Sequence, residues 1–289
     1  MTESVFQVAR SDGLSDKDFR RLSEFIESKS GIQMPDSKKS MLTARIQKRL
    51  RLLGMNSFTE YVDLVLNPKD QTHELTNFID IVTTNKTDFF REPNHFTYMS
   101  EIVMPKLMQE KAVGIARPLQ IWSAPCSTGE EPYTMAMVIQ EFSEQHRAYK
   151  AKILGTDLST RALDHARIAV YDMDKADPVP LALKRKYMLK GKDPLKPKVR
   201  MTPEIRSMVT FQHLNFMDAE YTIKQTMDII FCRNCLIYFD RPTAEQIVNK
   251  LCRNLAPNGY LFVGHSETLN KLNVPVTQVA PTIYQKGRG

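Results

Sequence analysis

The sequence predicts an α/β protein, in which a mostly parallel sheet covered by helices follows a small domain made only of helices. Two patterns predict this architecture. Apolar residues in roughly the first 80 positions recur at helical spacing, without strand-like alternation. From about residue 91 onward, short apolar runs alternate with helical stretches, which is typical of strands joined by crossover helices. We therefore place a helical domain at 14–90 and an α/β domain at 91–289.

The helical domain is predicted from its capping residues and its apolar spacing. Ser15 begins a capping-box-like pattern, and Gly31 stands where a C-terminal cap is expected. A second helix over about 36–54 is amphipathic, with basic residues beside its apolar stripe. A capping box at Ser57 begins a third helix, and the apolar spacing of 75–82 indicates a fourth.

In the α/β domain, apolar runs and amphipathic stretches follow one another in regular order. Strands are predicted at 119–125, 152–156, 209–214, 227–232 and 260–264, and helices at 131–144, 160–169 and 243–255. Residues 272–286 carry two prolines and predict a hairpin at the sheet edge. The proline-rich residues 172–207 break the order, so we expect them to form an inserted β-subdomain.

Charge is unevenly distributed along the chain. The 40 Lys and Arg residues against 33 Asp and Glu give a net charge of +7. Basic residues concentrate in 38–59 and 184–206, and the rest of the chain is mildly acidic. Such basic segments predict contact with nucleic acid, an anionic membrane surface or an acidic protein, and charge alone does not choose among them.

Location and assembly are predicted from the cysteines and the apolar runs. The four cysteines are too few and too scattered for a disulfide framework, which fits a reducing compartment. No apolar stretch has the length of a signal peptide or of a bilayer span. We expect a cytoplasmic protein that does not insert into a membrane. A monomer is the simpler expectation, because no long apolar surface stripe is evident.

Ligands of open parallel sheets bind at the carboxyl ends of the strands, so residues at these ends are site candidates. The turn after the first predicted strand holds a single glycine, Gly129, where a dinucleotide fingerprint needs three. Asp157 ends the second strand and suits either the hydroxyls of a ribose or the N-cap of the next helix. Asn215 and Phe216 suit a purine, although an Asn here is also a common turn residue. Arg233 leaves an apolar run and needs an anion at the strand end.

Five motifs in order carry a resemblance to a known family. They are Asn85-x-Thr87-x-Phe89-Phe90-Arg91-Glu92, Trp122-Ser-Ala-Pro-Cys-Ser-Thr-Gly129-Glu-Glu131-Pro-Tyr133, Asp157, Phe231-Cys-Arg233-Asn234-x-x-Ile237-Tyr238-Phe239-Asp240 and Gly264-His-Ser-Glu267. With them the chain resembles, from about 14 to 286, the CheR family of chemotaxis-receptor methyltransferases. The resemblance implies a Rossmann-like class I methyltransferase domain. This domain would transfer a methyl group from S-adenosylmethionine to glutamate side chains of chemoreceptors, leaving S-adenosylhomocysteine.

The resemblance also implies roles for ten residues. They are Arg91 for the cofactor carboxylate, Glu131 for its ammonium group, Asp157 for the ribose, Asn215 and Phe216 for the adenine, Asn85 and Thr87 for the wall beside the sulfonium, Arg233 and Asn234 for the region of the transferred methyl, and Tyr238 for the incoming glutamate. Of these, Arg233, Tyr238 and Arg91 are predicted to be catalytic. A glutamate is ionised at neutral pH, so this reaction needs alignment rather than a strong base.

The partners that the resemblance implies are the glutamate-rich cytoplasmic helices of receptors, along which the basic residues of 38–51 would lie. A solvated basic face without a partner is the competing interpretation. The insertion at 172–207 corresponds to a β-subdomain that, in some members, captures a receptor C-terminal peptide by strand addition. The protein would be recruited to receptors at the inner membrane.

Other chemistries fit the sequence less well. An RNA methyltransferase would use both basic segments, but no stacking aromatics interleave with them, so no nucleic-acid partner is expected. An inactive receptor-binding adaptor would not need the intact cofactor residues named above. Cys232 and Cys235 have the spacing of half a zinc site, yet no second pair exists. Residues three apart on an extended strand also point to opposite faces, so no metal is predicted.

Overall fold

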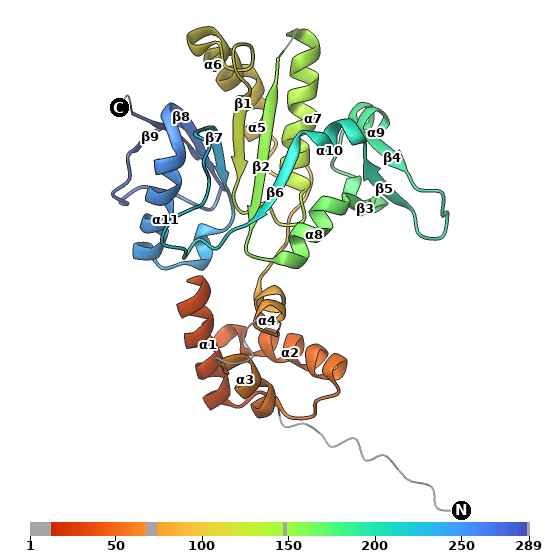
Figure 1. Cartoon of the computed structure of the whole chain (residues 1–289), viewed down its shortest axis with the longest axis vertical. Coiled ribbons are helices and arrows are strands. Elements are labelled where there is room, and N and C mark those ends of the chain that lie inside the picture. Colours follow the sequence, from red (N-terminus) through yellow and green to blue (C-terminus); the bar gives the residue numbers. More distant parts are fainter. Residues whose placement is uncertain (1–12, 68–73, 147–148, 288–289) are drawn as a thin grey trace, which may run out of the picture. The chain divides into compact units, whose positions relative to one another are not determined.

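The computed structural model describes residues 13–67, 74–146 and 149–287 (Figure 1). The chain forms two compact units with the boundary between Thr84 and Asn85, and each is described by itself. This boundary lies six residues before the predicted one at 90/91. The difference arises because the segment after Thr84 is bonded to the second unit. The Ser127 hydroxyl donates a hydrogen bond to the Asn85 carbonyl, and Phe89 is fully buried in the α/β core.

The described residues of the N-terminal unit form helices and no strand, as predicted. The helices are α1 (Asp16–Ser30), η1 (Asp36–Lys38), α2 (Lys39–Leu53), α3 (Phe58–Leu66) and α4 (Glu74–Val82). The Ser15 side chain accepts a hydrogen bond from the Asp18 N–H, and α1 ends at Gly31, which has a φ of 70° that a glycine adopts without strain. Apolar side chains from all four α-helices form one core, including Leu22, Ile46 and Phe78.

The second unit is built on a seven-stranded sheet. Its strands are β1 (Leu119–Ser123), β2 (Ala151–Asp157), β6 (Val209–His213), β7 (Met227–Cys232), β8 (Leu255–Val263), β9 (Val276–Ala280) and β10 (Ile283–Lys286). The order across the sheet is β6-β2-β1-β7-β8-β10-β9. The first five strands in this order are parallel, and the final hairpin is antiparallel, as predicted. The strand order reverses between β1 and β7, where α/β folds bind their ligands.

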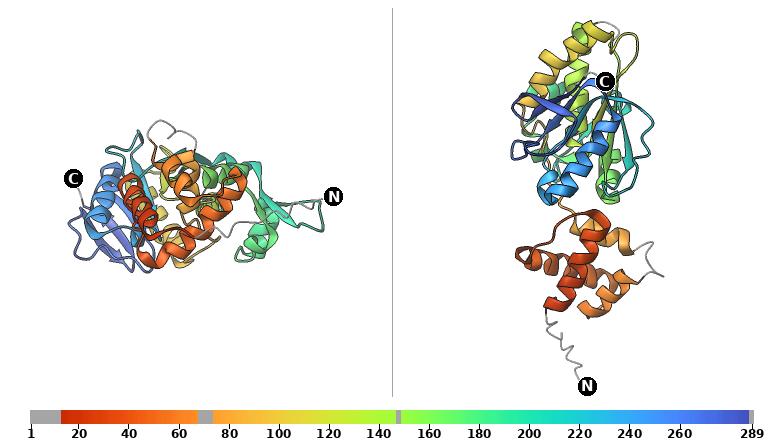
Figure 2. Two further views of the ribbon diagram at one scale, coloured as in Figure 1. Left: turned by 90° about the horizontal axis from the view of Figure 1, so that it is seen from below. Right: turned by 90° about the vertical axis from the view of Figure 1, so that its left-hand side faces the viewer.

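Helices cover both faces of this sheet (Figures 1 and 2). They are α5 (Asn94–Tyr98), the π-helix η2 (Met99–Val103), α6 (Met104–Lys111), α7 (Glu130–Gln145), α8 (Thr160–Ile168), α10 (Pro203–Ser207), η4 (Leu236–Tyr238) and α11 (Arg241–Asn254). In β7, Ile229 and Phe231 join the core with α5, α6 and α7, whereas Ile230 and Cys232 join the core with α11. This alternation explains why β7 reads as one continuous apolar run. Among the residues that the structure describes, no helix has the length and apolar character needed to cross a membrane.

The insertion forms a separate three-stranded antiparallel sheet, β3-β5-β4. Its elements are β3 (Val170–Asp172), η3 (Met173–Ala176), α9 (Leu181–Tyr187), β4 (Met188–Lys190) and β5 (Lys198–Met201). It begins two residues before the predicted 172–207, because Val170 and Tyr171 pair with Arg200 and Val199. The α/β fold with its helical N-terminal unit and its β-subdomain is thus as the sequence predicted.

Candidate functional site at the carboxyl ends of the strands

Four loop segments come together where the strand order reverses: residues 85–92, 123–131 after β1, 233–236 after β7 and 264–267 after β8. Hydrogen bonds join them directly. Ser127 bonds Asn85, and Asn234 Nδ2 donates to Glu92 Oε1 over 3.1 Å. The N–H of His265 donates to the same oxygen over 3.2 Å. The four segments therefore form one bonded cluster.

Arg233 lies at the centre of this cluster and is 5% exposed. Its Nε and Nη2 donate to Glu92 Oε2 over 3.2 and 2.8 Å, and its Nη1 donates to Glu131 Oε2 over 3.0 Å. Nη2 also donates to the Arg91 carbonyl over 2.5 Å. The guanidinium lies near the rings of Phe96 and Phe231, 5.6 and 5.8 Å from their centroids. The anion that the sequence required for Arg233 is thus supplied by the protein's own carboxylates.

Glu92 is the functional residue that the sequence analysis left without a role. Burial tends to raise the pKa of its carboxyl, but the charge of Arg233 and hydrogen bonds from Asn234 and the His265 N–H outweigh burial. The pKa consequently falls to about 2. The available signal was its position directly after Arg91 in the first motif, but only the fold brings it to Arg233.

Glu131 begins helix α7 with Glu130 and lies against both β1 and β7. Its Oε1 accepts a hydrogen bond from the Ser123 hydroxyl over 2.7 Å, and its Oε2 accepts from Arg233. Burial raises the pKa of this carboxyl despite the nearby charge of Arg233. A carboxylate offers about four lone-pair positions, so Glu131 retains acceptor capacity for a ligand ammonium group.

Asp157 ends β2 and is 6% exposed. Its Oδ2 accepts from the Ser127 N–H over 2.7 Å and its Oδ1 from the Ser159 N–H over 2.9 Å. Burial raises its pKa to about 6, because these two bonds offset only part of the desolvation. The N-cap of α8 is Ser159, whose side chain accepts from the Ala162 N–H. Asp157 is therefore not that N-cap.

The remaining predicted residues lie around the same end of the sheet. Asn215 and Phe216 follow β6 and are half-buried, and the Asn215 Oδ1 accepts from the Met217 N–H in a turn. Arg91 is half-buried, and its Nη1 donates to the Lys86 carbonyl over 3.2 Å. The Thr87 carbonyl accepts from Lys175 Nζ over 3.3 Å. Tyr238 ends η4 and is half-buried.

Glu267 fixes the loop after β7. Its two carboxylate oxygens accept four backbone N–H groups, those of Asn234, Cys235, Leu236 and Gly264, over 2.6–2.8 Å. A Cβ at Gly264 would lie 2.4 Å from the Asn234 Nδ2, so only glycine fits there. These contacts explain the Gly-His-Ser-Glu motif as a device that shapes the 233–236 loop.

Backbone strain is concentrated in the same segments. Among the described residues, nine non-glycine residues have positive φ, and Phe90, Glu92, Ser127 and Asn234 belong to the cluster. Left-handed backbone at such residues is held only where surrounding contacts fix it, and it is enriched at functional sites. Nothing in the sequence pattern predicted left-handed backbone at these four residues.

The prediction that Cys232 and Cys235 point apart was wrong. Their Sγ atoms lie 3.4 Å from one another, and both thiols are buried. The strand ends at Cys232, and Asn234 takes a φ of 57°, so the chain turns and the extended-strand rule does not apply.

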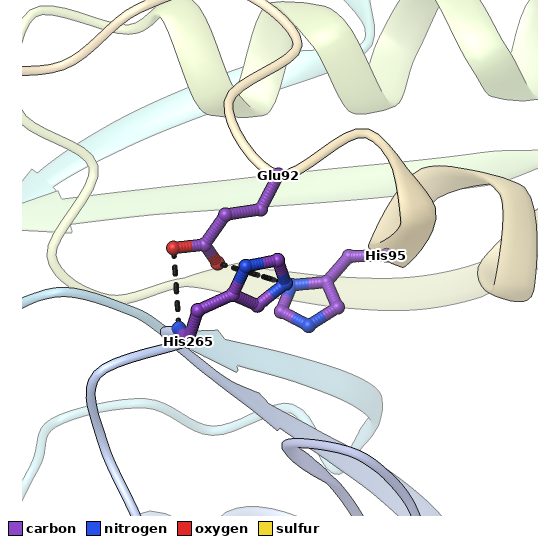
Figure 3. Close-up of side chains that lie close together, drawn as sticks. All are labelled: Glu92, His95 and His265. Carbon is purple, nitrogen blue, oxygen red and sulfur yellow. Dashed lines mark hydrogen bonds and ion pairs between the residues drawn. The ribbon is translucent and has the colours of Figure 1, made fainter.

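A second unforeseen group joins Glu92 to His95 of α5 and His265 after β8 (Figure 3). The His95 Nδ1 lies 3.5 Å from Glu92 Oε2, and the His265 Nε2 lies 4.0 Å from the same oxygen. Burial and the charge of Arg233 lower the pKa of His95 to about 4, so its ring is neutral at physiological pH.

The sequence predicted a helix whose exposed side is basic, but most basic residues of 38–51 make contacts within the N-terminal unit. Arg49 donates two hydrogen bonds to Glu74, and Arg45 Nη1 donates to three carbonyls at the end of α4. Lys39 pairs with Asp16, and Lys38 donates to the Gln33 carbonyl. Four of the six basic residues between 38 and 51 thus hold the N-terminal unit together, whereas the other two, Lys48 and Arg51, are exposed.

Comparison with known proteins agrees with this geometry. Residues 85–284 match the family model "CheR methyltransferase, SAM binding domain", and residues 17–83 match "CheR methyltransferase, all-alpha domain". The chain belongs to the CheR methyltransferase family. The two matches fall on the two structural units and account for both of them.

Curated members of the CheR family are similar over nearly the whole chain. The chemotaxis protein methyltransferase of Borreliella burgdorferi is 36% identical, over 92% of this chain and 93% of that protein. Chemotaxis protein methyltransferase 2 of Pseudomonas aeruginosa is 36% identical, over 93% and 92%. The chemotaxis protein methyltransferase of Escherichia coli is 34% identical, over 98% and 95%. This CheR protein is an S-adenosylmethionine-dependent methyltransferase of chemotaxis.

The residues at the site fit this cofactor. S-adenosylmethionine presents an ammonium group and a ribose diol, which need carboxylate acceptors, and a carboxylate, which needs a cation. Half-buried Glu131, buried Asp157 and half-buried Arg91 offer groups of these kinds at one end of the sheet. The site therefore holds a residue of the right chemical type for each of these three groups of the cofactor.

Proposed function

We propose that this CheR protein methylates glutamate side-chain carboxylates of chemoreceptors, forming methyl esters. One observation carries the proposal: the carboxylates of Glu131 and Asp157 lie at the carboxyl ends of β1 and β2, beside the point where the strand order reverses, inside the unit that matches the family's cofactor-binding domain. The curated relatives named above are chemotaxis protein methyltransferases, which supports a receptor as the acceptor.

In this proposal each residue of the site has a defined task. Glu131 binds the cofactor's ammonium group, Asp157 its ribose hydroxyls and Arg91 its carboxylate. Asn215 and Phe216 bind the adenine, and Asn85 and Thr87 line the wall beside the sulfonium. The bound cofactor supplies an electrophilic methyl group on its sulfonium.

Arg233 acts in this proposal mainly by positioning. Four of its five N–H groups are committed to Glu92, Glu131 and the Arg91 carbonyl, which leaves one for a substrate. It therefore fixes Glu131 and the backbone of Arg91, while Asn234 shapes the wall beside it. Tyr238 orients the incoming glutamate through its hydroxyl.

The acceptor is already a carboxylate at neutral pH, so no residue has to remove a proton. What the chain contributes is alignment of the attacking oxygen and exclusion of water around it. A strong hydrogen bond to the attacking oxygen would stabilise the nucleophile and slow the reaction. A single hydroxyl, that of Tyr238, meets this requirement better than a second cation.

The experiment is methyl transfer from radiolabelled S-adenosylmethionine to receptor-containing membranes, followed by mild alkali. We expect the receptor to carry label that alkali releases as volatile methanol, because methyl esters hydrolyse under these conditions. Alkali-resistant label, or label that requires added RNA, would contradict glutamate as the acceptor. Cofactor binding without any transfer to cognate receptor would favour a binding-only role.

Receptor docking forms the second part of the proposal. The exposed Lys48 and Arg51 of α2 contact the acidic receptor helices, and the β-subdomain receives a receptor C-terminal peptide by strand addition. The protein then acts from the cytoplasm at receptors of the inner membrane.

Reversing both charges with Lys48→Glu and Arg51→Glu should raise the KM for receptor membranes, and added salt should reduce the difference in KM between this variant and the parent protein. Lys17→Glu, on the exposed surface of α1, is the matched control and should leave KM unchanged.

A further inference from the structure

The imidazole of His95 is held in one tautomer by its neighbours. Its Nε2 lies 2.8 Å from the Thr282 Oγ1, and that hydroxyl donates its own proton to the Pro281 carbonyl over 2.7 Å. With the hydroxyl proton directed to the Pro281 carbonyl, the shorter of the two contacts, Thr282 accepts from His95 and Nε2 carries the hydrogen of the ring. The Nδ1 of His95 therefore presents a lone pair.

This lone pair has no hydrogen-bond donor, although His95 is only 2% exposed. A buried acceptor without a donor normally costs free energy, and such groups in folded proteins need an explanation. A histidine whose second nitrogen is bonded to an oxygen partner, with its first nitrogen open, is the arrangement that metal-binding histidines use.

Two further donor atoms face the His95 Nδ1 (Figure 3). Glu92 Oε2 lies 3.5 Å away, the His265 Nε2 lies 4.0 Å from Glu92 Oε2, and all three atoms lie within 4.8 Å of one another. Donor atoms in a tetrahedral zinc shell are roughly 3.3 Å apart. His265 has a side chain that is 52% exposed, so it can move by the small distance that remains.

The local charge permits a cation despite the presence of Arg233. Arg233 is one positive charge, and its guanidinium contacts both Glu92 and Glu131, so these groups together carry a net negative charge when ionised. Glu92 Oε2 accepts from both the Nε and the Nη2 of Arg233, so a bound cation would replace the weaker of these two bonds, that from Nε over 3.2 Å. The exposure of His265 leaves an entry path and a coordination position for water.

We propose that Glu92, His95 and His265 form a binding site for a divalent cation of the zinc class. Two imidazole nitrogens and one carboxylate oxygen favour Zn²⁺, Co²⁺, Ni²⁺ or Cu²⁺ over Mg²⁺ and Ca²⁺, which prefer oxygen ligands. The site differs from the zinc motif considered for Cys232 and Cys235. It is independent of the proposed receptor substrate, because it is defined by metal binding alone.

The test is metal titration of the full-length, tag-free protein after removal of metals with a chelator. Zn²⁺ is titrated by calorimetry, and Co²⁺ is titrated as a spectroscopic probe, since its visible absorption reports imidazole coordination in a tetrahedral shell. We expect one equivalent to bind, and His265→Ala and His95→Gln each to weaken binding at least about tenfold, since even loss of a partner outside the ligand shell costs that much. Mg²⁺ at the same concentration should not compete.

His165→Ala is the matched control, because His165 is an exposed histidine of α8 outside the group. It should bind Zn²⁺ like the parent protein. His265→Ala changes an exposed side chain and keeps the test decisive if His95→Gln does not fold. Absence of Zn²⁺ binding to the parent, or equal binding by His265→Ala, would overturn the proposal. A loss in His165→Ala with none in His265→Ala would likewise place the metal elsewhere and overturn it.

Discussion

Arg233 and Glu92 are 141 positions apart in the chain, and the Nη2 of Arg233 lies 2.8 Å from Glu92 Oε2. This pair joins the segment before α5 to the loop after β7. Glu131 forms a second ion pair with Arg233, in which its Oε2 lies 3.0 Å from the Nη1 of Arg233. A buried guanidinium between two carboxylates fixes the positions of Glu92 and Glu131.

Glu92→Gln should destabilise the methyltransferase unit. The pKa of Glu92 falls from 4.5 to about 2 in the folded protein, which corresponds to roughly 3 kcal/mol of stability at neutral pH. Because the carboxyl of Glu92 has a lower pKa in the folded than in the unfolded state, its ionisation stabilises the folded protein at every pH above 4.5. This stabilisation is lost as the pH falls from 4.5 through about 2. The Glu92→Gln variant lacks this stabilisation at pH 7. Urea unfolding followed by the fluorescence of Trp122, the only tryptophan and fully buried in β1, measures the loss.

Glu101→Gln is the control for this measurement. Glu101 is exposed on η2 of the same unit, so its replacement should change the free energy of unfolding by less than about 0.5 kcal/mol. Equal stability of the Glu92 and Glu101 variants would show that the Arg233 pair contributes no net stability.

Asp157 should give cofactor binding a pH dependence near 6. Burial raises its pKa to about 6, and only the ionised carboxylate accepts hydrogen bonds from both ribose hydroxyls. Affinity for S-adenosylhomocysteine should therefore fall as pH drops through 6. The stability of the folded protein depends on pH in the opposite direction. Above pH 6 the buried carboxylate of Asp157 is ionised, which destabilises the folded state. This destabilisation decreases as pH falls from 6 to 3.8, the ordinary pKa of an aspartate.

Calorimetric titration with S-adenosylhomocysteine between pH 5 and pH 8 would test this prediction. Asp157→Asn should bind weakly and without the step near pH 6. A parent protein whose affinity is constant across the range would remove Asp157 from the ribose site.

Arg91→Ala and Tyr238→Phe should separate binding from turnover. Loss of a charge-assisted hydrogen bond to the cofactor carboxylate costs about 1.5–3 kcal/mol, so Arg91→Ala should weaken S-adenosylhomocysteine binding roughly 10–150-fold. Tyr238→Phe should lower kcat by about tenfold with cofactor affinity nearly unchanged, because in the proposed function its hydroxyl contacts the acceptor and not the cofactor. Normal affinity in Arg91→Ala, or a large loss of affinity in Tyr238→Phe, would reassign these residues.

Glu267→Gln should destabilise the loop after β7. An amide offers one acceptor oxygen where the carboxylate serves four N–H groups, so two donors lose their partner at about 1–3 kcal/mol each. The free energy of unfolding should fall by the sum of these losses. The urea midpoint should fall accordingly, with little change in the slope of the free energy against urea concentration. Glu220→Gln, at an exposed position, is the comparison and should behave like the parent protein.

Local rules predicted the elements of this protein well. Capping at Ser15 and Gly31 set the ends of α1, and the apolar run 227–232 became β7 with the same bounds. Each depends on residues close together in sequence. The family was likewise readable, since its motifs are contiguous and occur in order.

The sequence by itself determined the order of helices and strands and the fold class, and it supplied the residues that we propose for the cofactor chemistry. The tertiary structure alone decided which charges meet. It brought Glu92 and Glu131 to Arg233, committed most of the basic residues of α2 to internal contacts, and turned Cys232 and Cys235 toward each other. The physical reason is that helix and strand periodicity depends on neighbours in sequence. Buried charge pairs and left-handed backbone instead depend on partners that only the packed sheet brings within reach.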